Sequence, residues 1–260
     1  MTDALLQLVY GYVALLIAAV LGLLILALTL LSRRASFRPR VLRRIDAFQS
    51  LPTTVGQAVE TGQRLHISLG AGAIGTADTA ITVAGLTVLD QISAAAAVSD
   101  RPPVVTTANG PAMLLAQDVL HSVYARQNAL ARYDPESAQV SGLTPISFGA
   151  AQTSLPGDEA AAGAVLIGAV GPEAVLLAEA GRRAGVTTLA GTDNLTTQAM
   201  LFATTDHPLV GEDVFAGAAY IGGQPQHLAS LTAQDLARVV MSVLILVGVV
   251  VWSLHGLGLY

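Results

Sequence analysis

The chain has 260 residues, of which 53% are hydrophobic and only 12% are charged, so it holds more apolar side chains than an ordinary soluble domain of this length. It contains no cysteine, and its thirteen Lys+Arg residues are all arginine. These absences exclude a thiolate nucleophile, a disulfide, a cysteine-ligated metal, a Schiff base and a Walker-type lysine.

The first apolar run is residues 5–31, which are 27 uncharged residues. At about 1.5 Å per helical residue, this run is long enough to cross about 30 Å of bilayer hydrocarbon. A cleaved signal peptide is the alternative, but it would have a shorter apolar region and a basic start, where this chain has Asp3. We therefore expect residues 1–32 to form a transmembrane helix.

A second apolar run of 21 residues, 239–259, contains His255 but no other side chain that can carry a charge. A buried core helix is the alternative, but the run lacks the polar face that most core helices keep. We therefore expect residues 238–260 to form a second transmembrane helix. His255 is close to the end of this helix, where interfacial solvation accounts for it.

Arginines flank the central part of the chain, because six of them lie in residues 33–44 and Arg238 precedes the second run. By the positive-inside rule, this pattern predicts a two-pass protein of the bacterial inner (cell) membrane, with both termini outside and residues 45–237 forming a cytoplasmic domain. The arginine-rich segment acts as a stop signal and is also expected to contact anionic lipid headgroups. The expected lipid-contact residues are Arg33, Arg34, Arg38, Arg40, Arg43 and Arg44.

The central domain is acidic, since residues 45–237 contain seventeen Asp and Glu residues against six arginines, a formal net charge of −11. Such a surface repels a phosphate backbone, and no basic stripe with interleaved aromatic residues offsets the repulsion. The lipid bilayer is therefore an expected partner, and nucleic acid is not.

Strand-like and helix-like stretches alternate along the central domain. Strands are predicted at residues 65–69, 104–107, 140–148 (as a broken strand), 163–167 and 186–189. Helices are predicted at residues 78–98, 112–132, 173–184, 195–203 and 211–236. Short strands separated by helices imply an α/β fold with a doubly wound, Rossmann-like, mainly parallel sheet of about five strands, flanked here by two transmembrane helices.

The best-formed motif is a G-x-G-x-x-G at residues 70–75, placed between a predicted strand and a predicted helix. Glycines in that position let the backbone approach a pyrophosphate at the N-terminus of a helix. The acidic residue that binds the ribose should end the second strand, where this chain has Thr106 and Thr107 instead. The alternative is that the glycines only permit close packing of helix on strand.

Small and polar residues also follow the other predicted strands, at the sheet edge that holds the ligand in open α/β folds. The alternative is that these residues simply cap helices. The cofactor is unknown, and the residues predicted to bind it are Gly70, Gly72, Gly75, Thr106, Asn109, Gly171 and Asp193.

Neither a metal site nor a catalytic residue is predicted. Asp193, Asp206, His207, Glu212 and Asp213 are close in sequence, but their spacing matches no metal-binding loop, and capping or solvation explains them. The chain has no G-x-S-x-G motif, and its five histidines have no evident serine or aspartate partner in sequence.

Four blocks of sequence occur in the order of a known family: residues 99–107 (SDRPPVVTT), 167–173 (IGAVGPE), 190–193 (AGTD) and 211–220 (GEDVFAGAAY). Together they resemble an uncharacterised bacterial membrane-protein family, the domain of unknown function 6754. The resemblance implies a membrane-anchored bacterial protein. Since that family has no assigned activity, no functional residue is carried over.

We expect a non-enzymatic, membrane-anchored binding or scaffold module that self-associates and holds a small phosphate-bearing ligand at the glycine turn, because few candidate acids, bases or nucleophiles are present. The first alternative is a nucleotide- or dinucleotide-using enzyme with Thr106, Asn109, Glu173 and Asp193 lining the crevice. The second is a structural subunit of a larger membrane complex, since small residues in the apolar runs permit close helix packing.

Overall fold

The computed structural model describes residues 44–99, 101–154, 157, 161–222 and 225–256, together with scattered positions between residues 12 and 30. The chain divides into two units, of which one is Arg44–Gly222 and the other combines Met1–Arg43 with Gly223–Tyr260. The predicted first span lies mostly outside the described residues. So does the arginine-rich segment apart from Arg44, whose Nε donates a hydrogen bond to Gln49 Oε1 (2.9 Å).

The unit Arg44–Gly222 is built on a six-stranded parallel sheet, with the strands in the order β3-β2-β1-β4-β5-β6. The strands are β1 (Arg64–Gly70), β2 (Val104–Thr107), β3 (Ala138–Val140), β4 (Ala161–Ala169), β5 (Thr187–Gly191) and β6 (His207–Leu209). This strand order is that of doubly wound dinucleotide-binding folds. The prediction of an α/β fold with a parallel sheet is confirmed, with six strands instead of about five.

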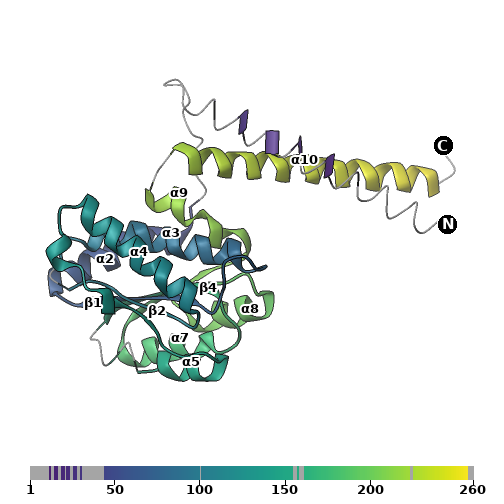
Figure 1. Cartoon of the computed structure of the whole chain (residues 1–260). Coiled ribbons are helices and arrows are strands. Elements are labelled where there is room, and N and C mark those ends of the chain that lie inside the picture. Colours follow the sequence, from purple (N-terminus) through teal and green to yellow (C-terminus); the bar gives the residue numbers. More distant parts are fainter. Residues whose placement is uncertain are drawn as a thin grey trace. The chain divides into compact units, whose positions relative to one another are not determined.

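Helices cover both faces of the sheet (Figure 1). One layer contains α2 (Asp46–Thr61), α3 (Thr79–Ala96) and α4 (Gly110–Arg126). The other contains α5 (Pro145–Gln152), α7 (Ala174–Ala184) and α8 (Leu195–Thr204). The remaining elements of the unit are the short helices η1 (Leu130–Arg132), η2 (Pro135–Ser137), η3 (Gly211–Ala216) and α9 (Gly217–Gly222).

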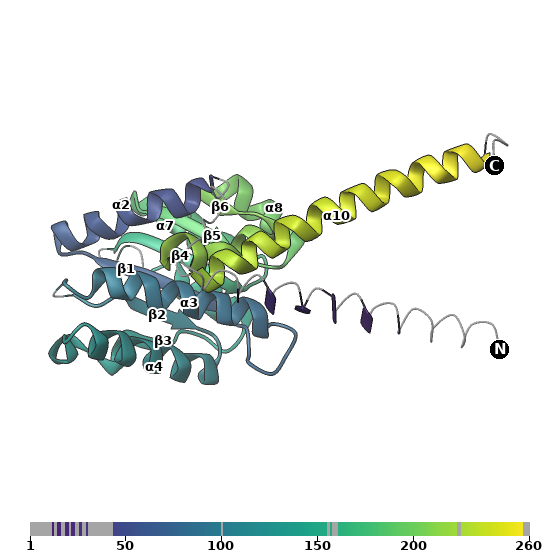
Figure 2. The same cartoon turned by 90° about the horizontal axis from the view of Figure 1, so that it is seen from above.

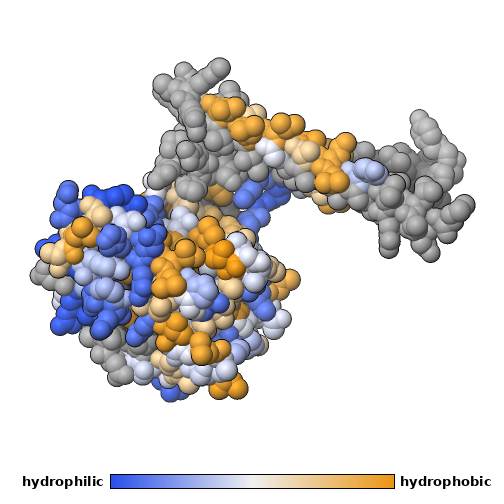
Figure 3. All heavy atoms as spheres, in the orientation of Figure 1, coloured by the Kyte–Doolittle hydropathy of each residue, from blue (hydrophilic) through white to orange (hydrophobic). Residues whose placement is uncertain are grey.

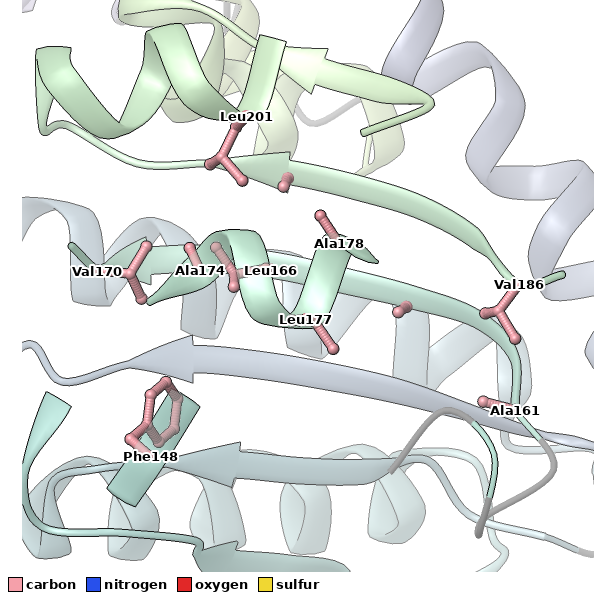
Figure 4. Close-up of a cluster of buried hydrophobic side chains, with 11 residues drawn as sticks. Phe148, Ala161, Leu166, Val170, Ala174, Leu177, Ala178, Val186 and Leu201 are labelled. Atoms are coloured by element: carbon pink, nitrogen blue, oxygen red, sulfur yellow. The ribbon is translucent and has the colours of Figure 1, made fainter. Parts of the chain in front are cut away.

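The core lies on both faces of β1 and β4, which are buried along almost their whole length. On the face covered by α5 and α7, helix and strand side chains pack into one apolar cluster (Figure 4). Its members are Phe148, Ala161, Ala164, Leu166, Val170, Ala174, Leu177, Ala178, Val186, Ala190 and Leu201. Many of them are alanines, which lets the helices approach the sheet closely.

Helix α3 has 18 residues and is the one helix, among the residues that the structure describes, that is long and apolar enough to cross a membrane. It packs on the sheet instead, and eight of its residues are buried. At Gly85 the approach is so close that an added Cβ would collide with the carbonyl oxygen of Ile167. The apolar composition of α3 is therefore that of a core helix.

Helix α10 (Pro225–Gly256) contains most of the second predicted span and has 32 residues. Its exposed large apolar side chains, each 49–65% accessible, are Val239, Val240, Met241, Val243, Leu244, Ile245, Leu246 and Val249. Residues 243–246 are consecutive and therefore point in all directions around the helix axis. In views from two directions α10 is a single long helix (Figures 1 and 2).

The strands differ from the sequence prediction in two places. Residues 140–148 do not form a broken strand, because β3 ends at Val140 and α5 begins at Pro145. The Thr144 hydroxyl accepts a hydrogen bond from Ser147 N (3.2 Å) and caps α5, and proline is favoured in a first helical turn. Strand β6 was not predicted, since it is a three-residue edge strand that contains Pro208.

Candidate functional site

The strand order reverses between β1 and β4, so the carboxyl ends of these two strands form the topological switch point of the sheet. Ligands of open α/β folds bind at this point. The predicted glycine turn, residues 70–75, follows β1, and Gly171 follows β4. These predicted residues therefore lie at the end of the sheet where its strands finish, next to the switch point.

Gly70 and Gly72 are required by packing at the switch point. Gly70 has a φ of +71°, and a Cβ there would come within 2.5 Å of the carbonyl oxygen of Ala169. A Cβ on Gly72 would collide with the hydroxyl of Thr82 in α3. Ala71 N donates to Ala169 O (2.8 Å), which fixes the turn against the end of β4. The close-packing explanation accounts for both glycines.

The turn differs from a dinucleotide-binding loop, because α3 begins only at Thr79, four residues after Gly75. In the dinucleotide-binding fingerprint the last glycine packs within the helix, and free N–H groups point at the phosphate. Here the Thr79 hydroxyl accepts hydrogen bonds from Gly75 N (2.9 Å) and Thr76 N (3.1 Å). These two donors are therefore used within the loop itself.

The two residues predicted at the end of β2 have different surroundings. Asn109 caps α4, since its Oδ1 accepts a hydrogen bond from Ala112 N (3.0 Å). Thr106 is fully buried, and its hydroxyl lies 2.8 Å from His66 Nε2. The side chain of Thr106 is therefore enclosed between the sheet and α5, where Gln152 contacts it, and does not line a crevice.

The residues that follow β4 and β5 are also engaged locally. Gly171 N donates to the Glu173 carboxylate (2.8 Å), and Asn194 caps α8 by accepting from Thr197 N (3.0 Å). Asp193 is exposed beside Thr192. Of the predicted residues at this edge, Asp193 thus offers an exposed carboxylate. Binding of a cofactor at these residues remains a prediction.

The five residues considered as a metal site are divided between two opposite edges of the sheet. These are the amino edge, where the strands begin, and the carboxyl edge, where they end. Asp206 and His207 are at the amino edge, where the Asp206 carboxylate accepts hydrogen bonds from Thr188 N (2.8 Å) and Thr188 Oγ1 (3.0 Å). Asp193, Glu212 and Asp213 follow strands and lie at the carboxyl edge. Within the described part of the chain, no three His, Asp or Glu side chains are grouped to hold a metal.

A buried polar network beneath α5 was not predicted. His66 of β1, Thr106 of β2, Gln152 of α5 and Ser141 form a connected chain, in which Gln152 Nε2 donates to Thr106 Oγ1 (3.2 Å) and to Ser141 Oγ (3.1 Å). Burial lowers the pKa of His66 to about 4, so its imidazole is neutral at neutral pH. Its partners lie 40 or more positions away in sequence, so no local pattern identifies the network.

A cavity of about 570 Å³ lies between α2 and the last turns of α3, away from the switch point. It is mostly apolar and is lined by Leu51, Pro52, Val55, Gly56, Val59, Glu60, Gln91, Ile92, Ala94, Ala95, Val98 and Ile221. Small residues on the facing helices leave this space open. It contains none of the residues predicted from sequence to bind a cofactor.

Large apolar side chains are exposed along the carboxyl edge, a feature that the sequence does not predict. They follow five of the six strands and are Ile74, Leu114, Leu143, Ile146, Leu195 and Val210. Leu143 and Ile146, on either side of the cap of α5, are 80% and 84% exposed. Figure 3 shows apolar side chains gathered on the side of the unit where α4, α5 and α8 begin, and hydrophilic ones on the opposite side.

The family model described as "Domain of unknown function (DUF6754)" matches residues 7–258 of the chain. No curated protein and no solved structure matches it. The matched region includes the whole sheet, the glycine turn and the whole of α10.

Proposed function

Because the chain belongs to the DUF6754 family, whose description assigns no activity, we propose from its structure that it is a membrane-anchored scaffold module. In this proposal the terminal segments hold the protein in a bilayer, and the α/β unit presents a binding surface to a protein partner. The observation that carries the proposal is the exposure of apolar side chains around the whole circumference of α10.

The environment of α10 has to be apolar on energetic grounds. Each large apolar side chain is stabilised by about 1.5–3 kcal/mol when it leaves water. Among the side chains described between Val239 and Val249, eight large apolar ones are exposed. A helix that is apolar on every side is found either inside a protein core or across a membrane. The described N-terminal positions are helical and equally exposed, at Leu15, Leu16, Val20, Leu23, Leu26 and Leu30.

The two connections to the α/β unit fit a common anchor. Phe48 at the start of α2 stacks on Tyr220 in α9, with ring centroids 5.6 Å apart, so the chain enters and leaves this unit at neighbouring points. Arginines of residues 33–44 and Arg238 flank the unit in sequence. By the positive-inside rule they favour a cytoplasmic position for the unit, with anionic lipid headgroups as the contacts of the arginine-rich segment.

A binding role is favoured over catalysis by the chemistry of the carboxyl edge. Polar residues there cap helices or bond to neighbouring backbone, as Asn109 and Asn194 do. Large apolar side chains are strongly exposed there, such as Leu143 at 80% and Ile146 at 84%. An enzyme of nucleotides would need acids, bases and free N–H groups to converge on this edge.

Membrane anchoring is tested by alkaline carbonate extraction of membranes that contain the full chain. The wild type is expected to stay in the membrane fraction. A variant with four exposed leucines of the terminal segments replaced by aspartate is expected to be released, since one aspartate at a span centre costs about 2.5–3.5 kcal/mol. These four are Leu16, Leu23, Leu244 and Leu246.

The matched control replaces four exposed leucines of the α/β unit by aspartate, and it is expected to stay in the membrane. These are Leu114, Leu130, Leu143 and Leu195. Release of the wild type by carbonate, or a monodisperse wild type in buffer without detergent, would contradict the anchor.

The scaffold role is tested by a thermal-shift screen of the full chain in detergent against nucleotides, dinucleotides and divalent cations. A ligand at a hundredfold excess over its Kd stabilises a protein by about 2.7 kcal/mol, so a specific ligand is easily seen. We expect no shift. A nucleotide that stabilises the wild type but not an Asp193→Asn variant would favour the enzyme alternative instead.

A further inference from the structure

The cavity between α2 and α3 lies entirely within the α/β unit, away from the switch point. Helix α2 lines it with one stripe of residues from Leu51 to Glu60, which recur at every fourth position and so share one side of the helix. Ala94 and Ala95 line it from α3, and Ile221 lines it from α9. At 1.5 Å per helical residue, the cavity follows α2 for about 14 Å.

The stripe of α2 contains proline and glycine, the two residues least favourable in a helix interior. Pro52 has no N–H to donate to the carbonyl of Phe48, four residues earlier, and Gly56 follows one turn later. Close packing explains Gly85 in α3, but a Cβ on Gly56 would meet no atom within 4 Å. Packing within the chain therefore does not require Gly56, and its effect is to leave space in the cavity. Such departures from local preference are expected at functional sites.

The chemistry of the lining favours an aliphatic ligand. Among the lining residues that the structure describes, none is aromatic and none is arginine or histidine. A nucleobase would therefore find no ring to stack on, and a phosphate would find no cationic partner. Glu60 lines the cavity, and Arg101 lines a small pocket that shares Val59 with it. Because both signs of charge occur near this end, the apolar lining selects the ligand and charge does not.

The size of the cavity favours one small ligand over a protein partner. Its volume of about 570 Å³ is within the range of small-molecule sites, about 300–1,000 Å³. Its twelve lining residues are fewer than the roughly 20–30 that each partner contributes to a stable protein interface. A methylene group is similar in size to a water molecule, about 30 Å³ in the liquid, so the volume corresponds to fewer than about twenty such groups. One alkyl chain fits, and the two chains of a bilayer lipid do not.

We propose that the cavity between α2 and α3 binds the alkyl chain of a single-chain amphiphile, such as a fatty acid or a lysolipid. The chain lies along the stripe of α2 and contacts Val59, Val98 and Ile221, which are aliphatic and incompletely buried. Its polar end lies near the exposed Glu60. The proposal goes beyond the scaffold function, because it assigns the protein a second kind of ligand. It does not depend on the membrane anchor, since every lining residue belongs to the α/β unit.

The test measures protection of a single thiol in the full chain, which has no natural cysteine. Ala95→Cys places a thiol in the lining of the cavity, and Thr53→Cys places one on the exposed surface of α2 outside it. The protein is kept in a steroid-based detergent, which has no alkyl chain, and is labelled with a water-soluble maleimide in the presence of dodecanol or octanol. We expect saturating dodecanol to slow labelling of Ala95→Cys by about tenfold or more and that of Thr53→Cys by less than about twofold. Octanol should need at least about a tenfold higher concentration, because each buried methylene group adds to the affinity.

The variant that fills the cavity is Gly56→Leu, made together with Ala95→Cys. Since a Cβ at position 56 meets no atom within 4 Å, the fold should tolerate the larger side chain, and thermal stability should be unchanged or higher. We expect the concentration of dodecanol that protects the thiol to rise by about tenfold or more. The matched control, Gln57→Leu, adds the same side chain at the neighbouring exposed position and should keep that concentration within about twofold.

Organic extraction of protein purified from membranes, followed by mass spectrometry, identifies the natural ligand. A single-chain amphiphile that is present with the wild type and lost from Gly56→Leu would support the proposal. Two labelling results would overturn it, namely that dodecanol does not protect Ala95→Cys, or that it protects equally well when Gly56→Leu is present. A two-chain lipid that is lost from Gly56→Leu would also overturn it, because it would assign the cavity to a lipid of the bilayer.

Discussion

Helices α3 and α10 are both long and rich in apolar residues, yet the structure gives them opposite environments. In α3 one face is buried against the rest of the unit, and Ile81 and Leu89 are completely buried. In α10 the residues around Leu244 are exposed on every side. Apolar composition alone therefore does not distinguish a core helix from an anchor. The difference lies in whether a complementary surface of the same chain covers the helix.

The largest expected contrast comes from placing one carboxylate in each helix. Leu89→Asp buries an unpaired charge in α3 and should destabilise the α/β unit by about 4 kcal/mol or more. Leu244→Asp should change the stability of that unit by less than about 0.5 kcal/mol. Thermal unfolding of the full chain in detergent measures both effects, and equal losses would remove the distinction between the helices.

The buried network beneath α5 predicts how the stability of the core depends on pH. The pKa of His66 is about 4 in the folded protein and 6.5 ordinarily, so the unfolded chain takes up a proton first as the pH falls. Stability is therefore full above about pH 6.5 and decreases by about 3 kcal/mol as the pH falls to 4. The free energy of unfolding measured between pH 7 and pH 4 checks this. His66→Gln should abolish the part of the pH dependence that His66 contributes.

A smaller contrast separates two glycines, one in each helix. Gly85→Ala in α3 forces a Cβ against the carbonyl oxygen of Ile167 and should cost about 1–3 kcal/mol. Gly248 in α10 has open space around its Cα, so Gly248→Ala should leave stability unchanged or raise it slightly. Denaturant midpoints of the two variants measure the difference. A Gly248→Ala variant as unstable as Gly85→Ala would show that α10 is packed like a core helix.

The smallest effect concerns a residue predicted from sequence to bind a cofactor. Asn109→Ala removes the cap of α4 and should cost about 1 kcal/mol of stability. Asn109→Ser, which keeps a capping oxygen, should recover most of that loss. If binding of a nucleotide changed while stability did not, the residue would have a functional role instead of a structural one.

Much of the fold was accessible from the sequence, because the central strands are apolar runs separated by helical patterns. The predicted strands at 104–107, 163–167 and 186–189 overlap β2, β4 and β5. The edges of the sheet were not accessible, since β3 and β6 have three residues each and little pattern to detect. The stretch around Phe148 is apolar enough to suggest a strand, and the capping residue Thr144 decides in favour of a helix.

The candidate site was predicted less completely than the fold. The glycine turn is where the sequence placed it, but its relation to α3 depends on the length of the loop up to Asp78, which the motif does not specify. The exposure of Leu143 and Ile146 could not be predicted, because apolar residues in a pattern normally indicate burial. The network of His66 requires knowledge of which strands are neighbours.

The lipid environment of α10 is tested most directly by single-cysteine labelling, since the natural chain contains no cysteine. Leu244→Cys and Leu143→Cys are each exposed to a water-soluble maleimide in intact membranes and again after denaturation. The account predicts that Leu143→Cys reacts in both conditions and that Leu244→Cys reacts only after denaturation. Rapid labelling of Leu244→Cys in intact membranes would contradict it.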